Sequence, residues 1–163
     1  MDLRHRRGPL RRLNDQPTTK NITREEKNTV ITYQDAPLPK FGNYSTLGIG
    51  APGEIVVVAG QMGADADGEF PTSDGAEQVK ATYDNLGVAL AAAGLGFEHV
   101  IGFRTYVVGR EMIPEFMKGR LAKFPEIYPS GIYPPNTLLI VAGLVEEKAR
   151  VEIEALAIRP AAS

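Results

Sequence analysis

The pattern of apolar and polar positions predicts three strands at the start of the folded region. Residues 28–34 are rich in β-branched side chains, and Pro37 and Pro39 end this segment. Residues 44–49 predict a weaker second strand. Residues 54–59 are apolar at nearly every position, which is typical of a central strand buried on both faces.

Two amphipathic helices are predicted downstream of these strands. Asp74 and Glu77 have the spacing of a capping box, and apolar residues follow at helical intervals until Gly94, a residue typical of the position just beyond a helix end. A second, shorter helical stripe covers residues 113–121, and Pro125 is expected to end that helix.

Further strands are predicted at residues 99–108, 136–144 and 150–158. The order of elements predicts an α+β fold, with a six-stranded mixed sheet and two helices on one face. Two helices cover only one face of such a sheet, yet residues 54–59 and 137–142 are apolar in nearly every position. We therefore expect further copies of the chain to cover the second face.

The composition favours one domain. The chain of 163 residues is 43% hydrophobic and 23% charged, values typical of soluble globular proteins. We expect the domain to span residues 29–163. Residues 1–28 are predicted to form a basic, flexible arm, because five arginines against Asp2 alone precede residue 14. A leader is the favoured interpretation, and contact with nucleic acid and an organellar transit peptide are the alternatives.

Residue usage excludes several kinds of chemistry. The absence of cysteine excludes disulfides, thiolate nucleophiles and cysteine-ligated zinc, and His5 and His99 are too isolated for a multi-histidine metal site. No metal or cofactor is therefore expected. No apolar run reaches the length of a membrane span and no secretory signal is present, so we expect a cytoplasmic protein without a membrane partner.

Two short motifs receive structural interpretations. Gly48, Gly50 and Gly53 have the spacing of a dinucleotide fingerprint, but that fingerprint opens a helix, whereas a strand follows here. We interpret these glycines as a turn. The acidic residues within 65–69 lack the ligand spacing of a calcium loop and are interpreted as a hairpin turn.

Four polar residues are candidates for a site. Glu152 and Glu154 occupy alternate strand positions and therefore share one face of the predicted sheet. Either that face is solvated, or it is the self-associating face, where loss of water raises a carboxyl pKa toward the range useful for general acid catalysis. Arg104 lies in an apolar strand, which is typical of a salt bridge and sometimes of an anion site. Tyr44 is interpreted as a packing residue, with a hydroxyl donor as the alternative.

Several segments together resemble the RidA/YjgF family of reactive-intermediate deaminases, formerly described as endoribonucleases. The resemblance covers roughly residues 37–159 and implies a chorismate-mutase-like fold. It also implies a homotrimer with small-molecule pockets between its subunits. The matching segments are Pro39-x-x-Gly42-x-Tyr44, Val58-Ala59-Gly60-Gln61, Asn85-Leu86, Ala91-Ala92-Ala93-Gly94 and Val151-Glu152-Ile153-Glu154-Ala155-Leu156-Ala157.

One segment departs from the family pattern. Founding members use an arginine in a Pro-x-Arg-Ser segment to bind the carboxylate of their imine or enamine substrate. The corresponding segment here is Pro134-Pro135-Asn136-Thr137, which places Asn136 at the arginine position. An amide does not form the charged bidentate pair of a guanidinium. Arg104 and Arg120 are the candidates to replace the missing charge.

The resemblance also assigns roles to other residues. It implies that Tyr44 is the tyrosine of the family pocket and that Glu152 is the acid that positions the attacking water. The serine and the cysteine of the founding pocket are alanine and leucine here, so a less polar pocket is expected. The residues expected to bind substrate are Ala59, Gly60, Asn136, Thr137 and Leu138.

These residues lead to two main hypotheses. The first is a Rid-type enzyme that hydrolyses or converts a small imine, enamine or carbonyl metabolite, with Glu152 acting on water and Tyr44 as a hydrogen-bond donor. The second is a homotrimer that binds a small metabolite without turnover. Nucleic-acid binding is the third and weakest hypothesis, because only the basic arm favours it.

Overall fold

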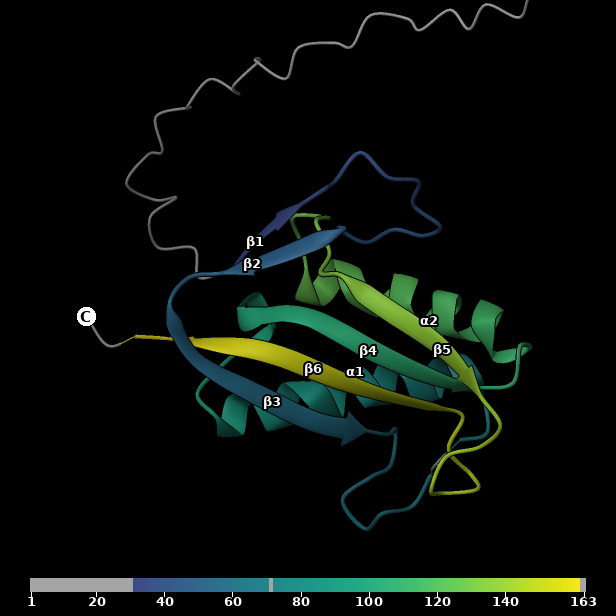
Figure 1. Cartoon of the computed structure of the whole chain (residues 1–163). Coiled ribbons are helices and arrows are strands. Elements are labelled where there is room, and N and C mark those ends of the chain that lie inside the picture. Colours follow the sequence, from purple (N-terminus) through teal and green to yellow (C-terminus); the bar gives the residue numbers. More distant parts are fainter. Residues whose placement is uncertain (1–30, 71, 162–163) are drawn as a thin grey trace, which may run out of the picture.

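The computed structural model describes residues 31–70 and 72–161, and Figure 1 shows the arrangement of their elements. The predicted order of strands and helices is confirmed. The expected basic arm, residues 1–28, lies outside the described residues. In chain order the elements are β1 (Ile31–Gln34), β2 (Leu47–Gly50), β3 (Gly53–Gln61), α1 (Gly75–Ala92), the short 3-10 helix η2 (Phe97–His99), β4 (Val100–Val108), α2 (Met112–Ile127), β5 (Asn136–Val141) and β6 (Val151–Pro160).

The strands form a four-stranded mixed sheet and a separate two-stranded hairpin, so the prediction of a single six-stranded sheet is corrected. The larger sheet has the order β3-β6-β4-β5, in which only the β4–β5 pair is parallel. β1 and β2 pair with each other. Pro52 separates β2 from β3, and its missing N–H interrupts the ladder there. The Tyr33 hydroxyl fastens the hairpin to the larger sheet by donating to the Val100 carbonyl oxygen at 2.5 Å.

β3 is an edge strand and not the central strand that its apolar run indicated. Val58 faces the core, whereas Ile55 and Val57 on the other face are 70% and 71% exposed. The sequence pattern is therefore right about the apolar character of both faces, but one chain buries only one of them. An apolar edge strand with a bare face favours association with another chain.

Both helices pack on the same face of the larger sheet (Figure 1). Asp74 caps α1 by accepting a hydrogen bond from the Glu77 backbone N–H at 3.0 Å, and Gly94, with a φ of 71°, follows its end. The expectation that Pro125 ends the second helix is wrong, because α2 continues to Ile127. So close to the helix end, the proline removes one backbone hydrogen bond without stopping the last turn.

The core between the sheet and the helices contains a cluster of edge-to-face aromatic rings. Tyr83 of α1 lies with its ring centroid 5.8 Å from that of Phe103 in β4 and 5.2 Å from that of Phe124 in α2. Tyr128 and Tyr133 extend the cluster along the segment that leads into β5. These contacts fix the start of β5 against α2.

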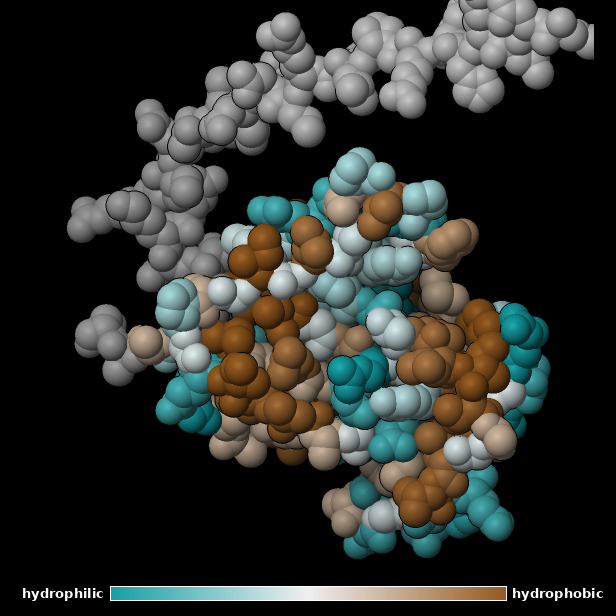
Figure 2. All heavy atoms as spheres, in the orientation of Figure 1, coloured by the Kyte–Doolittle hydropathy of each residue, from teal (hydrophilic) through white to brown (hydrophobic). Residues whose placement is uncertain are grey.

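The opposite face of the sheet carries no helix, and Figure 2 shows this face. Two apolar areas lie there on either side of a hydrophilic strip. Neither helix in the described part of the chain is long and apolar enough to cross a membrane. The large apolar side chains exposed on β2, β3, β5 and β6 include Leu47, Ile49, Ile55, Val57, Leu139 and Leu156.

Candidate functional site

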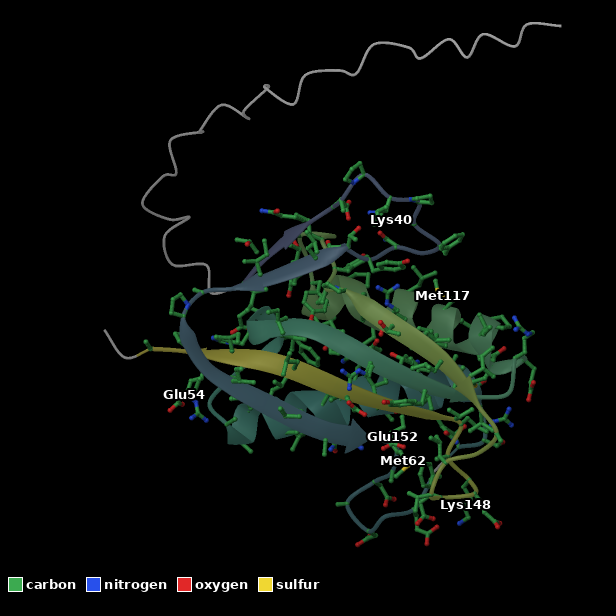
Figure 3. All side chains as sticks on the ribbon, in the orientation of Figure 1. Lys40, Glu54, Met62, Met117, Lys148 and Glu152 are labelled. Carbon is green, nitrogen blue, oxygen red and sulfur yellow. The ribbon has the colours of Figure 1, made fainter. Side chains whose placement is uncertain are left out.

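Glu152 lies near the start of β6 on the helix-free face. Its neighbours Val151 and Ile153 are fully buried, and strand alternation directs Glu152 to the opposite side of the sheet. The carboxylate packs against Gly60, where a Cβ atom would collide with Oε1. Figure 3 shows Glu152 close to Met62, which follows the end of β3. The side chain is half-buried in one chain.

Ala59 and Gly60 belong to an irregular part of β3. The pairing of β3 with β6 shifts register between Val58 and Gln61, which is typical of a β-bulge. The Gln61 side-chain amide donates to the carbonyl oxygens of Ala59 and Gly60 at 3.1 and 3.3 Å. The structure therefore brings Gly60 and Glu152 together.

Asn136 begins β5 and faces the helices. It lies opposite the core residue Phe103, and its Oδ1 atom accepts a hydrogen bond from the Thr105 hydroxyl at 2.9 Å. Thr105 is fully buried. Leu138 also packs against the core, whereas Thr137 points to the helix-free face. Asn136 and Leu138 thus share one face of β5, and Thr137 lies on the other.

Tyr44 lies in the loop between β1 and β2. Its hydroxyl oxygen lies 3.5 Å from the Phe41 backbone nitrogen, which donates to it. The backbone on either side of Tyr44 is hydrogen bonded to Arg120 of α2 and to Tyr133. Because Tyr133 shortly precedes Asn136, the loop lies on the side of the molecule where β5 begins (Figure 1).

One chain does not bring all the expected site residues together. Glu152 and Gly60 form one group on the helix-free face, whereas Asn136 is directed toward the helices. In Figure 3, Lys40, which shares its loop with Tyr44, is well separated from Glu152. Glu152 and Gly60 therefore form one group, and neither Asn136 nor the loop that carries Tyr44 belongs to it.

A hollow of about 520 Å³ lies on the helix-free face between β2 and the larger sheet. Arg104 and Glu154 line it and form the expected salt bridge, with Nη1 and Oε2 3.2 Å apart. The Tyr106 hydroxyl donates to the other carboxylate oxygen of Glu154 at 2.8 Å, and this bond raises the pKa of Tyr106. Sequence reasoning missed Tyr106, although its position two residues after Arg104 indicates the same face.

Within a single chain, neither Arg104 nor Arg120 replaces the substrate-binding arginine that founding members carry at the position of Asn136. Arg104 pairs in register with Thr137 and so faces away from Asn136. Arg120 is only 3% exposed and lies over the rings of Phe124 and Tyr133. Among residues 31–70 and 72–161, no three His, Asp or Glu side chains gather into a group that could bind a metal ion.

Comparison with known sequences shows to which family this chain belongs. The family described as Endoribonuclease L-PSP matches residues 34–159. An uncharacterized protein of Streptomyces coelicolor is 32% identical over 111 residues, which cover 68% of this chain and 79% of that protein. The chain therefore belongs to the Endoribonuclease L-PSP family, which is the RidA/YjgF family that its motifs resemble.

Solved structures agree with this assignment. A conserved Rid-family protein, YyfB from Yersinia pestis, matches with a TM-score of 0.67 and 22% identity, over 80% of this chain and 99% of that chain. E. coli TdcF, solved with bound serine, matches with a TM-score of 0.59 and 25% identity, over 80% of this chain and 98% of that chain. The chain has the Rid fold.

Proposed function

We propose that this chain is a Rid-type enzyme that hydrolyses or converts a small imine, enamine or carbonyl metabolite in a pocket completed by a second copy. The observation that supports this is that Glu152 lies with Gly60 on the helix-free face, whereas Asn136 is directed toward the helices and Tyr44 lies in the β1–β2 loop. One chain therefore holds only part of the site that the family resemblance implies around Glu152. Association of copies is the simplest way to bring the remaining residues to it.

The proposed assembly is a homotrimer in which the helix-free sheet faces point inward. The apolar areas of this face include Ile55, Val57 and Leu156. Burial of these exposed apolar side chains favours the association of copies. In this arrangement Glu152 of one copy is proposed to lie at the β5 edge of the next, where it reaches the start of β5 with Asn136 and the loop with Tyr44. We also propose that the protein is located in the cytoplasm.

The substrate is proposed to be a small polar compound that needs no strict carboxylate anchor. The Oδ1 atom of Asn136 already accepts from the Thr105 hydroxyl, which leaves the Nδ2 group free to donate. A neutral amide donor holds a carbonyl or hydroxyl oxygen, but it does not neutralise a carboxylate as an arginine does. The serine bound in TdcF supports a pocket of metabolite size.

The proposed reaction on an imine is a hydrolysis. Glu152 accepts a proton from water while the water oxygen bonds to the C=N carbon, and the π electrons move to nitrogen. Glu152 passes that proton to the nitrogen, which gives a carbinolamine. Glu152 then takes the proton of the new hydroxyl group and returns it to the nitrogen, so that the C–N bond breaks, ammonia or an amine leaves, and the C=O bond of a carbonyl compound forms. Tyr44 and the Asn136 amide donate hydrogen bonds that hold the substrate.

The test is turnover of freshly generated imines. Purified protein is expected to accelerate the decay of imino acids or of neutral enamines, with a larger effect on the neutral compounds. The Glu152→Gln variant should lose about 100-fold in rate. Glu126→Gln, an exposed position on α2, is the matched control and should keep the wild-type rate. Decay at the uncatalysed rate with both substrate classes would rule out the enzyme.

A non-catalytic metabolite-binding trimer is the second candidate. It is favoured by the neutral Asn136 side chain at the position where founding members carry a charged residue. Unchanged decay of all imines and enamines, together with a rise in melting temperature on addition of a small keto or amino acid, supports this function. Catalysed decay excludes it.

A further inference from the structure

Arg120 of α2 is a buried arginine in the layer between the helices and the loop that carries Tyr44. Only 3% of its surface is exposed. Its guanidinium carbon lies 4.2 Å from the centroid of the Phe124 ring and 5.4 Å from that of Tyr133. The two rings hold the guanidinium in place by cation–π contact.

Arg120 binds the backbone directly beside Tyr44. Its Nη2 atom donates to the Asn43 carbonyl oxygen at 2.6 Å. On the other side of Tyr44, the Ser45 backbone N–H donates to the Tyr133 carbonyl oxygen at 2.9 Å. Arg120 also packs on the Tyr133 ring, so its guanidinium holds the Asn43 carbonyl directly and contacts the residue that holds Ser45.

The local environment of Arg120 is unfavourable for a charge. Within the described residues, its Nε atom and the Tyr83 hydroxyl are buried without a hydrogen-bond partner. Burial lowers the pKa of Arg120 below its ordinary value. An apolar side chain of similar volume commonly stabilises a fold as well as, or better than, such a buried charge. Stability alone therefore gives no reason for an arginine at this position.

We propose that Arg120 is a positioning residue that holds Tyr44 in its place in the substrate pocket. This inference rests on the proposed function for the role of Tyr44, but the anchoring of the loop is independent of it. Arg120 does not bind substrate, because its guanidinium is enclosed by aromatic rings and one of its amino groups is committed to Asn43. The Arg120 charge is buried without a full set of hydrogen-bond partners, and its proposed role is to fix the position of Tyr44.

The first test measures the loop without any substrate. In Arg120→Met, hydrogen exchange at the Ser45 amide should become about tenfold faster or more, because the loop loses its anchor at the Asn43 carbonyl, two residues earlier. The melting temperature should stay the same or rise. Arg120→Lys, which keeps one donor, should restore part of the protection at Ser45.

The matched control is Lys123→Met on the same helix. Lys123 is also largely buried and contacts Asp84 and Glu126, each at 2.7 Å, but it makes no contact with the loop. This variant should leave exchange at Ser45 unchanged. Unchanged exchange at Ser45 in Arg120→Met, or equal acceleration in Lys123→Met, would overturn the proposal.

The second test uses the reaction. Arg120→Met should lower kcat about tenfold with little change in KM, and it should have no further effect in a Tyr44→Phe background. A merely structural role would instead lower kcat equally in both backgrounds, which would contradict the positioning role. If the wild-type protein turns over no imine, the proposed function fails, whereas the exchange measurement still decides whether Arg120 anchors the loop.

Discussion

The contact between Glu152 and Gly60 shows how one missing side chain shapes the site. A Cβ atom at position 60 would meet the Glu152 carboxylate and would push it away from β3. Only glycine allows the carboxylate to lie flat on this part of the strand. The position of the proposed catalytic acid is therefore set by the residue opposite it.

This contact makes Gly60→Ala a sensitive variant. The methyl group should displace the Glu152 side chain, which is flexible enough to move without disturbing the backbone. We expect turnover to fall as far as in Glu152→Gln, while the free energy of unfolding changes by no more than about 1 kcal/mol. Kinetic assays and chemical denaturation measure the two effects. Full activity in Gly60→Ala would show that the carboxylate acts from another position.

Asn136→Arg tests whether the pocket of the family is retained. The guanidinium should bind 2-keto or 2-imino acids about tenfold tighter or more, since it pairs with the carboxylate. The change also removes the acceptor of the buried Thr105 hydroxyl. Thr105→Val in the same chain removes that unpaired group and is expected to recover the lost stability. Isothermal calorimetry that shows no gain in affinity in the folded double variant would contradict the placement of the site.

The contacts of individual residues were only partly predictable from the sequence. Glu152 and Gly60 could be assigned together because both lie in segments that resemble the family. The bond between Thr105 and Asn136 could not be predicted, since it depends on β5 lying parallel to β4. Arg120 falls within the predicted helical stripe and is buried, but its contacts with Phe124, Tyr133 and the Asn43 carbonyl could not be predicted, since they depend on how the β1–β2 loop packs on α2.

At the scale of elements, Gln78 of α1 joins three separate parts of the chain. Its side chain is fully buried and donates to the carbonyl oxygens of Thr72 and Lys148, each at 3.0 Å. It also accepts from the Arg150 backbone N–H at 2.8 Å. These bonds fix both loops that flank the start of β6, the strand that carries Glu152.

Gln78→Leu should therefore be strongly destabilising. Loss of three buried hydrogen bonds is expected to lower the free energy of unfolding by about 3 kcal/mol. Gln61→Leu is the control, because within the described part of the chain the amide of Gln61 bonds only to the carbonyl oxygens of its two preceding residues. Urea denaturation compares the two variants. Equal stability of both would show that Gln78 does not join these loops in solution.

The elements themselves were largely predictable because their signals are local. The cap at Asp74 and the positive φ of Gly94 follow from single residues and are confirmed. The extent of α2 was underestimated, because a proline in the last helical turn costs little. The edge position of β3 was missed, since an apolar run indicates buried faces without showing what buries them.

At the scale of the whole molecule, the uncovered sheet face is the central feature. The count of two helices predicted it, and the exposed side chains of β3 and β6 show it in the structure (Figure 2). The salt bridge of Arg104 with Glu154 lies within the hydrophilic part of this face. A charged pair enclosed between copies favours one arrangement of the copies over others. The homotrimer itself stays a prediction.

The proposed site requires Glu152 and Asn136 to meet across two copies of the chain. The chain contains no cysteine, so two introduced thiols are the only ones present. The Asn136→Cys/Glu152→Cys double variant is treated with a short bismaleimide cross-linker, and the products are separated on a denaturing gel. The two single variants serve as controls.

Covalent dimers and trimers are expected from the double variant, because each cross-link joins two chains. The single variants should give almost only monomers. A double variant that remains monomeric, whether it is linked within one chain or not linked at all, would contradict the claim that two copies complete the site.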